Sequence, residues 1–412
     1  MWHGTRGVSM SESPFEEFES VFRNRDVLKE DYEPNEILER DDEIQAYASA
    51  LNPARHGAHP DNVFIYGKTG VGKTAVTKYL LEVLETEVDE DPSVDSEVTT
   101  LLVNCQYSTT SYQALIALLN ALRGPHDQVS ATGHAPQDLY NMLWHELDEI
   151  GGTVLIALDE IDAIGSDDGL LYQLPRARAN GNLENARLGI IGISNDYQFR
   201  QNLSPKVKDT LCEREINFSQ YDADQLFAIL EQRATKALRP DTYDTAALRK
   251  TAAIAARDRG SARQALELLM VAGDLAEERD GVLTEALVDE AEDDLERGRI
   301  EDRIRDQTVH AQYSLLALVR LTDRTESAVR TKDVYRTYER VVAHNGSDSL
   351  SLDRFRDQLD ELAMLGFASK TQANEGRQGG RYNEYRATVA TDPVVDILTS
   401  DADLDFPPSM PR

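Results

Sequence analysis

Short apolar runs and helical patterns alternate between residues 60 and 220. Five runs have the length and composition of buried β-strands, and they occupy residues 63–66, 98–104, 153–158, 188–194 and 215–218. The segments between them place apolar residues at helical spacing instead. Strands that alternate with helices are typical of a parallel sheet covered on both faces. The pattern therefore predicts an α/β domain over residues 15–220.

The strand pattern stops at Asp222, and helical spacing then continues alone to about residue 299. Helices are predicted at about 222–238, 242–258, 261–279 and 283–299. The last three follow Asp241, Gly260 and Gly281, residue types that commonly separate helices. Residues 221–302 are therefore predicted to form a small all-helical domain.

A third pattern covers residues 303–392. It predicts three helices and then two alternating segments around a glycine-rich tip, at 311–321, 331–342, 351–365, 367–371 and 382–389. The apolar face of the third helix comprises Leu352, Phe355, Leu359, Leu362 and Leu365. Three helices followed by a β-hairpin predict a winged helix-turn-helix. The remaining residues, 393–412, are expected to be a poorly ordered tail.

The turn after the first predicted strand carries the strongest chemical signal. Its sequence matches G-x-x-x-x-G-K-[ST], between a strand and a helix, which is the context that a phosphate-binding loop requires. Glycines let backbone N–H groups turn inward around phosphate oxygens, Lys73 can reach the β- and γ-phosphates, and the Thr74 hydroxyl can bind Mg²⁺. The predicted site for ATP and Mg²⁺ comprises Gly67, Lys68, Thr69, Gly70, Val71, Gly72, Lys73, Thr74 and Ala75.

Polar residues follow two other predicted strands. Asp159 and Glu160 end the third strand, and Asn195 follows the fourth. The carboxyl ends of parallel strands meet at one edge of the sheet, so these side chains are expected near the phosphates. Asp159 would join Thr74 in the Mg²⁺ shell, Glu160 would orient the attacking water, and Asn195 would bind that water or the γ-phosphate. The alternative is a solvated acidic turn and a turn-forming asparagine.

Composition bears on partners and location. The formal net charge is −31 and the isoelectric point about 4.6, but residues 303–386 contain slightly more basic than acidic residues. Abundant acid with arginine favoured over lysine is typical of a salt-loving organism. Molar salt screens charges beyond roughly 3 Å, so the acidity does not exclude DNA binding. Without a membrane-spanning run or a signal peptide, we expect a cytoplasmic protein with no membrane partner.

The motifs together resemble one family. The phosphate loop, Asp159-Glu160-Ile161-Asp162, Asn195 and Gly260-Ser261-Ala262-Arg263 before a winged helix are similar to the archaeal replication initiators. These are AAA+ ATPases related to the eukaryotic origin-recognition and helicase-loading subunits, and the composition suggests a haloarchaeal member. The resemblance extends over residues 22–389. It implies an AAA+ parallel sheet with a helical lid and a C-terminal winged helix.

The resemblance also implies residue roles. Asn195 would be the first sensor, and Arg263 the second, reaching from the lid to the γ-phosphate. The segments Asp31-Tyr32-Glu33-Pro34 and Glu39-Arg40 would line the adenine pocket. By the same resemblance, the remaining nucleotide contacts are Tyr32, Arg40, Tyr221 and Arg233.

One position departs from the family pattern. Where relatives often have an arginine finger, this chain has Lys206. A lysine offers a point charge and lacks the planar fork of a guanidinium. Lys206 could serve weakly, Arg214 could substitute, or hydrolysis could be slow. We expect slow hydrolysis, that is, a weak ATPase used as a switch.

The predicted winged helix supplies the candidate DNA contacts. The third helix of such domains enters the major groove, and the wing reaches a neighbouring groove or the backbone. The candidates are Arg354, Arg356, Lys370, Arg377 and Arg381. Acidic residues share the third helix, so an ion pair is the alternative role for its arginines.

The resulting hypothesis is an ATP-dependent replication initiator. It would bind double-stranded origin DNA, recruit or load the replicative helicase, and associate with itself or with paralogous initiators on DNA. The alternative is an AAA+ winged-helix transcriptional or signalling regulator. The origin sequence, the oligomeric state on DNA, the helicase contact surface and a purely regulatory role are left open by the sequence.

Overall fold

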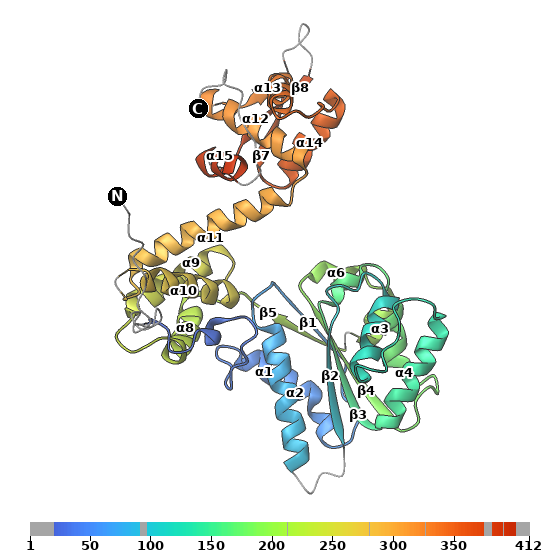
Figure 1. Ribbon diagram of the computed structural model, residues 1–412. Coiled ribbons are helices and arrows are strands. Elements are labelled where there is room, and N and C mark those ends of the chain that lie inside the picture. The colour runs from blue at the N-terminus through green and yellow to red at the C-terminus, as the bar shows by residue number, and fades with distance from the viewer. Residues whose placement is uncertain are drawn as a thin grey trace, which may run out of the picture. The chain divides into compact units, whose positions relative to one another are not determined.

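The computed structural model describes residues 20–90, 97–211, 213–279, 281–325, 327–374, 381–389 and 391–400. The chain divides into two compact units between Asp289 and Glu290, and each unit is described by itself (Figure 1).

A five-stranded parallel sheet forms the centre of the first unit. Its strands are β1 (Val63–Gly67), β2 (Val98–Asn104), β3 (Gly152–Asp159), β4 (Ala186–Ser194) and β5 (Arg214–Phe218). They lie in the order β2-β3-β4-β1-β5, with every neighbouring pair parallel. The predicted α/β class is confirmed, and β1 lies beside β4, so the phosphate loop and Asn195 follow adjacent strands.

Helices cover both faces of this sheet. They are α1 (Asp41–Arg55) and α2 (Lys73–Glu90) on one side and α3 (Ser111–Leu122) and α4 (Pro136–Ile150) on the other (Figure 1). Alternate residues of β3 explain the two layers, because Val154, Ile156 and Leu158 join one apolar cluster with α3 and α4. Their neighbours in β3 are also fully buried but face the opposite side.

Short elements follow β3 and β4. They are the 3₁₀ turns η2 (Ile161–Ile164) and η3 (Leu174–Arg176) and the helices α5 (Gly169–Gln173), α6 (Tyr197–Asn202) and α7 (Pro205–Leu211). Lys206 lies in the first turn of α7.

The predicted helical lid is confirmed. It contains α8 (Ala223–Ala237), α9 (Thr245–Asp258), α10 (Ala262–Glu277) and the start of α11 (Glu285–Arg305). Asp222 and Gln225 form a capping box at the start of α8, and the Ser261 side chain caps α10. The 3₁₀ turn η1 (Arg25–Leu28) packs against α8 and α10, which brings the N-terminal segment to the lid.

The second unit is a winged helix, as predicted. Its elements are α12 (Val309–Thr325), β6 (Val329–Arg330), α13 (Thr331–His344), α14 (Leu352–Met364), β7 (Ala368–Asn374) and β8 (Arg381–Ala387). The strands form an antiparallel sheet in the order β6-β8-β7. Phe355, Leu359 and Leu362 of α14 are fully buried, whereas Leu365 lies just after the helix and is 38% exposed.

The end of the described chain differs from the expected tail. Residues 391–400 form the helix α15 (Thr391–Ser400), and Val394, Val395, Ile397 and Leu398 are buried in the core of the second unit. Ile304 of α11 is buried in the same core. Burial of these apolar side chains favours a helix over a solvated tail.

Candidate nucleotide-binding site

The loop between β1 and α2 has the backbone that a phosphate cradle needs. Gly70 and Gly72 have φ values of 79° and 91°, which side chains rarely adopt. A Cβ atom on Gly70 would lie 2.0 Å from the Ser261 hydroxyl, and one on Gly72 would lie 2.9 Å from the Tyr221 hydroxyl. Glycine is therefore required both for the conformation and for the close approach of the lid.

Three successive carbonyl groups of the loop are bound from outside it. Gly70 accepts from the Ala262 N–H at 2.9 Å, Val71 from Arg40 at 3.0 and 3.2 Å, and Gly72 from the Val76 N–H at 2.9 Å. In a planar trans peptide the following N–H points the opposite way. The N–H groups of residues 71–73 therefore point away from these partners, as phosphate binding requires.

Lys73 crosses the loop. Its ammonium group donates to the Gly67 carbonyl, the Lys68 carbonyl and Asn195 Oδ1, each at 2.8 Å. Burial lowers the pKa of Lys73 to about 8, although the negative charges of Asp159 and Asp162 act in the opposite direction. Lys73 thus carries its charge at neutral pH and lies beside the end of β4.

The ends of β1, β3 and β4 bring the other predicted catalytic residues together. The Thr74 hydroxyl donates to Asp159 Oδ2 at 2.7 Å, and the Asn195 side-chain amide lies 3.5 Å from Glu160 Oε1. The Asn195 backbone N–H donates to Asp162 Oδ1 at 3.0 Å. Glu160 has a left-handed backbone, with φ 54° and ψ 39°. Three neighbouring strands therefore present their polar residues at one edge.

The donor set at this edge fits Mg²⁺. Mg²⁺ prefers oxygen ligands and is commonly bound by one or two protein groups together with water and substrate phosphates. Thr74 and Asp159 offer a hydroxyl and a carboxylate in direct contact. Within the described ranges, no group of three or more His, Cys, Asp or Glu side chains could bind a metal by itself. The site thus suits a metal that arrives with phosphate.

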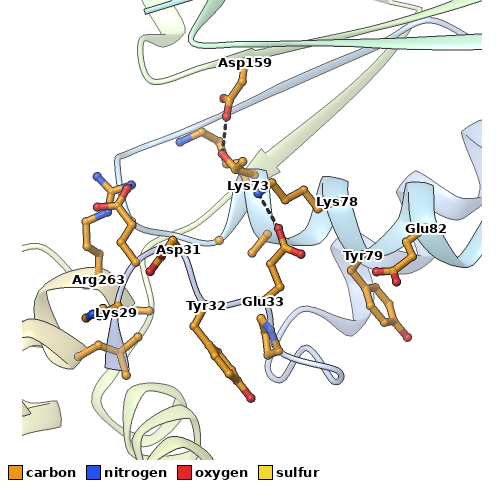
Figure 2. Close-up of a pocket in the computed structure, with 18 of the residues that line it drawn as sticks. Lys29, Asp31, Tyr32, Glu33, Lys73, Lys78, Tyr79, Glu82, Asp159 and Arg263 are labelled. Atoms are coloured by element: carbon orange, nitrogen blue, oxygen red, sulfur yellow. Dashed lines mark hydrogen bonds and ion pairs between the residues drawn. The ribbon is translucent and has the colours of Figure 1, made fainter. Parts of the chain in front are cut away.

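A cavity of about 1160 Å³ opens beside this edge. Figure 2 shows its walls, which come from the N-terminal segment, α2, the end of β3 and the lid. The predicted residues that line it are Tyr32, Thr69, Gly70, Gly72, Lys73, Thr74, Ala75, Asp159, Glu160, Asn195, Arg233 and Arg263. Arg263 forms an ion pair with Glu30, and the Arg233 guanidinium lies 4.5 Å from the centre of the Tyr32 ring.

Other predicted residues lie outside the cavity. The side chains of Arg40 and Tyr221 are 1% and 5% exposed, and neither is among the residues that line the cavity. Lys206 is also outside it, with its ammonium group 6.0 Å from the Tyr172 ring. Arg214 forms a 2.8 Å ion pair with Asp61 at the start of β5, at the opposite end of the strand from the phosphate loop.

The candidate DNA contacts have unequal surroundings. Arg356 pairs with Asp353 at 2.7 Å, and Lys370 pairs with Asp360 at 2.6 Å. Arg354 is exposed and has no ion pair with any residue that the structure describes. Arg377 and the side chain of Arg381 fall outside the described part of the chain.

Sequence reasoning missed Glu30 and one group of cations. Glu30 lies in the cavity wall and pairs with Arg263, next to Glu33, which was expected in the adenine pocket and pairs with Lys78. One face of α13 carries a ridge of exposed cations, formed by Lys332, Arg336 and Arg340. Their spacing of four residues was a readable signal, because such positions share one face of a helix.

Comparison with known proteins agrees with this architecture. Three family models match: "AAA domain" at residues 56–197, "Cdc6 AAA+ ATPase-type lid domain" at 227–293 and "CDC6, C terminal winged helix domain" at 302–397.

No helix in the described part of the chain has the length and apolar character to span a membrane.

Similar proteins are found in several archaea. "ORC1-type DNA replication protein 8" of Halobacterium salinarum is 49% identical over 95% of this chain and 98% of its own length. A protein of Thermococcus onnurineus with the same type of name is 36% identical over 95% of both chains. The solved ORC1 protein of Aeropyrum pernix in complex with DNA is 33% identical, with a TM-score of 0.75 over 92% of this chain and 97% of that one. The chain therefore belongs to the family of ORC1-type DNA replication proteins.

Proposed function

We propose that this chain is an ATP-dependent replication initiator that binds origin DNA and recruits or loads the replicative helicase. The convergence of the phosphate loop, three strand ends and the lid around one cavity carries the nucleotide part of this proposal. The winged helix and the solved DNA complex of the Aeropyrum pernix relative support the DNA part.

In the proposed site, each residue has a task that its position allows. Lys73 binds the β- and γ-phosphates after exchanging its present acceptors for phosphate oxygens. Thr74 and Asp159 would bind Mg²⁺, which when present neutralises phosphate charge. Glu160 orients a water with help from Asn195, and Arg263 reaches the γ-phosphate once it leaves Glu30.

Hydrolysis is proposed to be slow. The cavity contains no contribution from Lys206, so this residue could act only on the nucleotide of a second copy or a paralogue. Even there, a lysine lacks the bidentate geometry of an arginine finger, which can accelerate hydrolysis by about 10³–10⁵. The ATP-bound form would then persist on DNA and act as the switch.

Two measurements test this proposal. Equilibrium binding of labelled ATP should be lost in Lys73→Ala and kept in Glu160→Gln, while single-turnover hydrolysis should be lost in both. Genome-wide crosslinking should then place the wild-type protein at replication origins. Crosslinks at promoters without origins would identify a transcriptional regulator instead, and ATP binding by Lys73→Ala at wild-type affinity would overturn the site.

A further inference from the structure

Arg40 has the most completely buried charged side chain near the phosphate loop. It precedes α1 and is 1% exposed. Its Nε and Nη2 atoms both donate to the Val71 carbonyl, at 3.2 and 3.0 Å, and Nη2 also donates to the Ser219 carbonyl at 2.7 Å. Nη1 donates to Glu43 at 2.8 Å. The guanidinium therefore joins the phosphate loop to the segment after β5.

The face of the guanidinium is used as well. It lies 3.7 Å from the centre of the Tyr221 ring and 5.5 Å from that of Phe218. Buried arginine is tolerated when its N–H groups are paired and its plane stacks on aromatic rings. A lysine has neither the planar fork nor the stacking surface, so it could not make these contacts together.

The contacts of Arg40 lie at the hinge between the sheet and the lid. Ser219 and Tyr221 connect β5 to α8, and the Tyr221 N–H donates to the Gly260 carbonyl at 3.0 Å, just before α10. The Tyr221 hydroxyl lies so close to Gly72 that a Cβ there would approach it to 2.9 Å. The hinge thus touches the loop both through Arg40 and directly.

A second contact runs from the lid to the same loop. The first N–H of α10, that of Ala262, donates to the Gly70 carbonyl at 2.9 Å, one residue before the predicted second sensor Arg263. Consecutive loop carbonyls are therefore bound by the lid and by Arg40. A rotation of either peptide would move the lid, the hinge or both.

We infer that Arg40 is a positioning residue that couples the shape of the phosphate loop to the position of the lid. It keeps the Val71 carbonyl outward, so the next N–H points into the cradle, and it transmits loop changes to Tyr221. This role rests on the proposed nucleotide-binding function and replaces the adenine contact expected for Arg40. Phosphate binding and lid position become one equilibrium through this side chain.

The test measures ATP affinity and hydrogen exchange in the full chain. In the wild type, ATP should slow exchange in peptides that cover the loop, residues 67–76, and in those that cover the hinge and lid start, residues 219–226 and 258–266. Arg40→Lys should weaken ATP binding at least roughly tenfold, because hydrogen bonds to a charged group are lost. At saturating ATP, the phosphate loop of Arg40→Lys should still be protected from hydrogen exchange, whereas residues 258–266 should not be.

Two further variants separate coupling from general damage. Arg123→Lys, just after α3, alters a partly buried ion pair with Glu146 outside the cavity and should leave affinity and both protections unchanged. Tyr221→Leu removes the stacking ring without leaving a buried charge unpaired and should reproduce the Arg40→Lys pattern. In the double variant the fold losses of ATP affinity should not multiply, because both residues act through one contact.

The outcomes are distinguishable. Failure of the wild type to bind ATP would overturn the proposed function itself. Wild-type affinity and full protection of residues 258–266 in both Arg40→Lys and Tyr221→Leu would overturn the coupling role while leaving the nucleotide site intact. The coupling role would also be overturned by a second pair of results. Hydrogen exchange would be faster throughout the sheet of Arg40→Lys, and ATP would still protect residues 258–266 in Tyr221→Leu. Arg40 would then serve fold stability alone.

Discussion

Lys73 has a buried ammonium group whose protonation should respond to the nucleotide. Burial lowers its pKa from 10.5 to about 8. Between these two values the unfolded chain binds more protons than the folded one, so this residue makes stability increase with pH across that window. In the proposed ATP complex, phosphate oxygens would add negative charge beside the ammonium group and so raise its pKa.

ATP affinity should therefore vary with pH in the alkaline range. Below about pH 8 Lys73 is already charged, and its contribution to affinity should be constant. Above that value binding must take up a proton, and affinity should fall by up to about tenfold per pH unit until the pKa of the complex is reached. Calorimetry in buffers of different ionisation enthalpy at pH 7 and 9 measures the proton uptake directly. Equal affinity and no uptake at both values would contradict the prediction.

Glycines at two positions offer a matched test of the loop geometry. Gly72 and Gly281 both have a positive φ, 91° and 70° respectively. A Cβ added to Gly72 would approach the Tyr221 hydroxyl, whereas a Cβ added to Gly281 would meet no neighbour. Alanine at either position should lower the free energy of unfolding by about 1 kcal/mol through backbone strain. Only Gly72→Ala should also weaken ATP binding. Urea unfolding and nucleotide titration of both variants decide this, and equal ATP affinities would disprove the assigned geometry.

Among the elements, the hairpin and α14 are joined by a charged contact. Asp360 of α14 accepts from the Tyr385 hydroxyl of β8 and pairs with Lys370 of β7 at 2.6 Å. Acidic residues outnumber arginines on α14, whereas α13 carries the exposed ridge of cations. Phosphate attraction is therefore weaker on the predicted recognition helix than its arginines alone suggest.

Lys370 and Arg354 should differ in their effect on DNA binding. Arg354 is exposed and unpaired among the described residues, so its loss should flatten the slope of log K against log[salt] by up to about 0.9. Lys370 already has a carboxylate partner, so Lys370→Ala should change the slope by much less. Salt titrations of the two full-length variants on one duplex measure this. A larger change for Lys370→Ala would show that the pair opens on DNA.

Sequence patterns predicted the regular elements but not the buried polar contacts. Apolar periodicity located β1 to β5 and the helices of the lid, because local spacing determines which face is buried. The two-residue strand β6 is too short to leave such a pattern. The partners of Arg40 lie 31 and 179 residues away in sequence, and only the packed structure shows that they meet. The tail predicted from residue 393 was likewise wrong, because the helix α15 is held by burial of its apolar side chains against distant parts of the second unit.

At the scale of the whole molecule, the boundary between the two units lies within α11. Ile304 of that helix is fully buried in the core of the second unit, and the Arg303 guanidinium lies 4.7 Å from the centre of the Phe367 ring and donates to the Leu365 carbonyl. The winged helix thus includes the last part of α11 in its core. A fragment that starts after this helix would lack those contacts.

Two fragments should differ in thermal stability. Residues 290–412 keep Ile304, whereas residues 309–412 lose it, which should cost about 2–4 kcal/mol. For a domain of this size that corresponds to a decrease in Tm of roughly 10 °C or more. Circular dichroism melting at molar salt compares them, with Ile304→Ala in the longer fragment as the control. Equal Tm values for the two fragments would show that α11 contributes nothing to this domain.

At Glu160, fold stability favours glycine because the backbone is left-handed, whereas the proposed hydrolysis requires the glutamate side chain. A non-glycine residue at φ 54° costs about 1 kcal/mol that glycine would not. Glu160→Gly should therefore unfold at higher urea concentration while losing single-turnover hydrolysis, and a lower midpoint would refute this. A laboratory selection for stability alone would then favour glycine at this position. Under the proposed function, selection for hydrolysis, the step that resets the switch, would oppose this replacement.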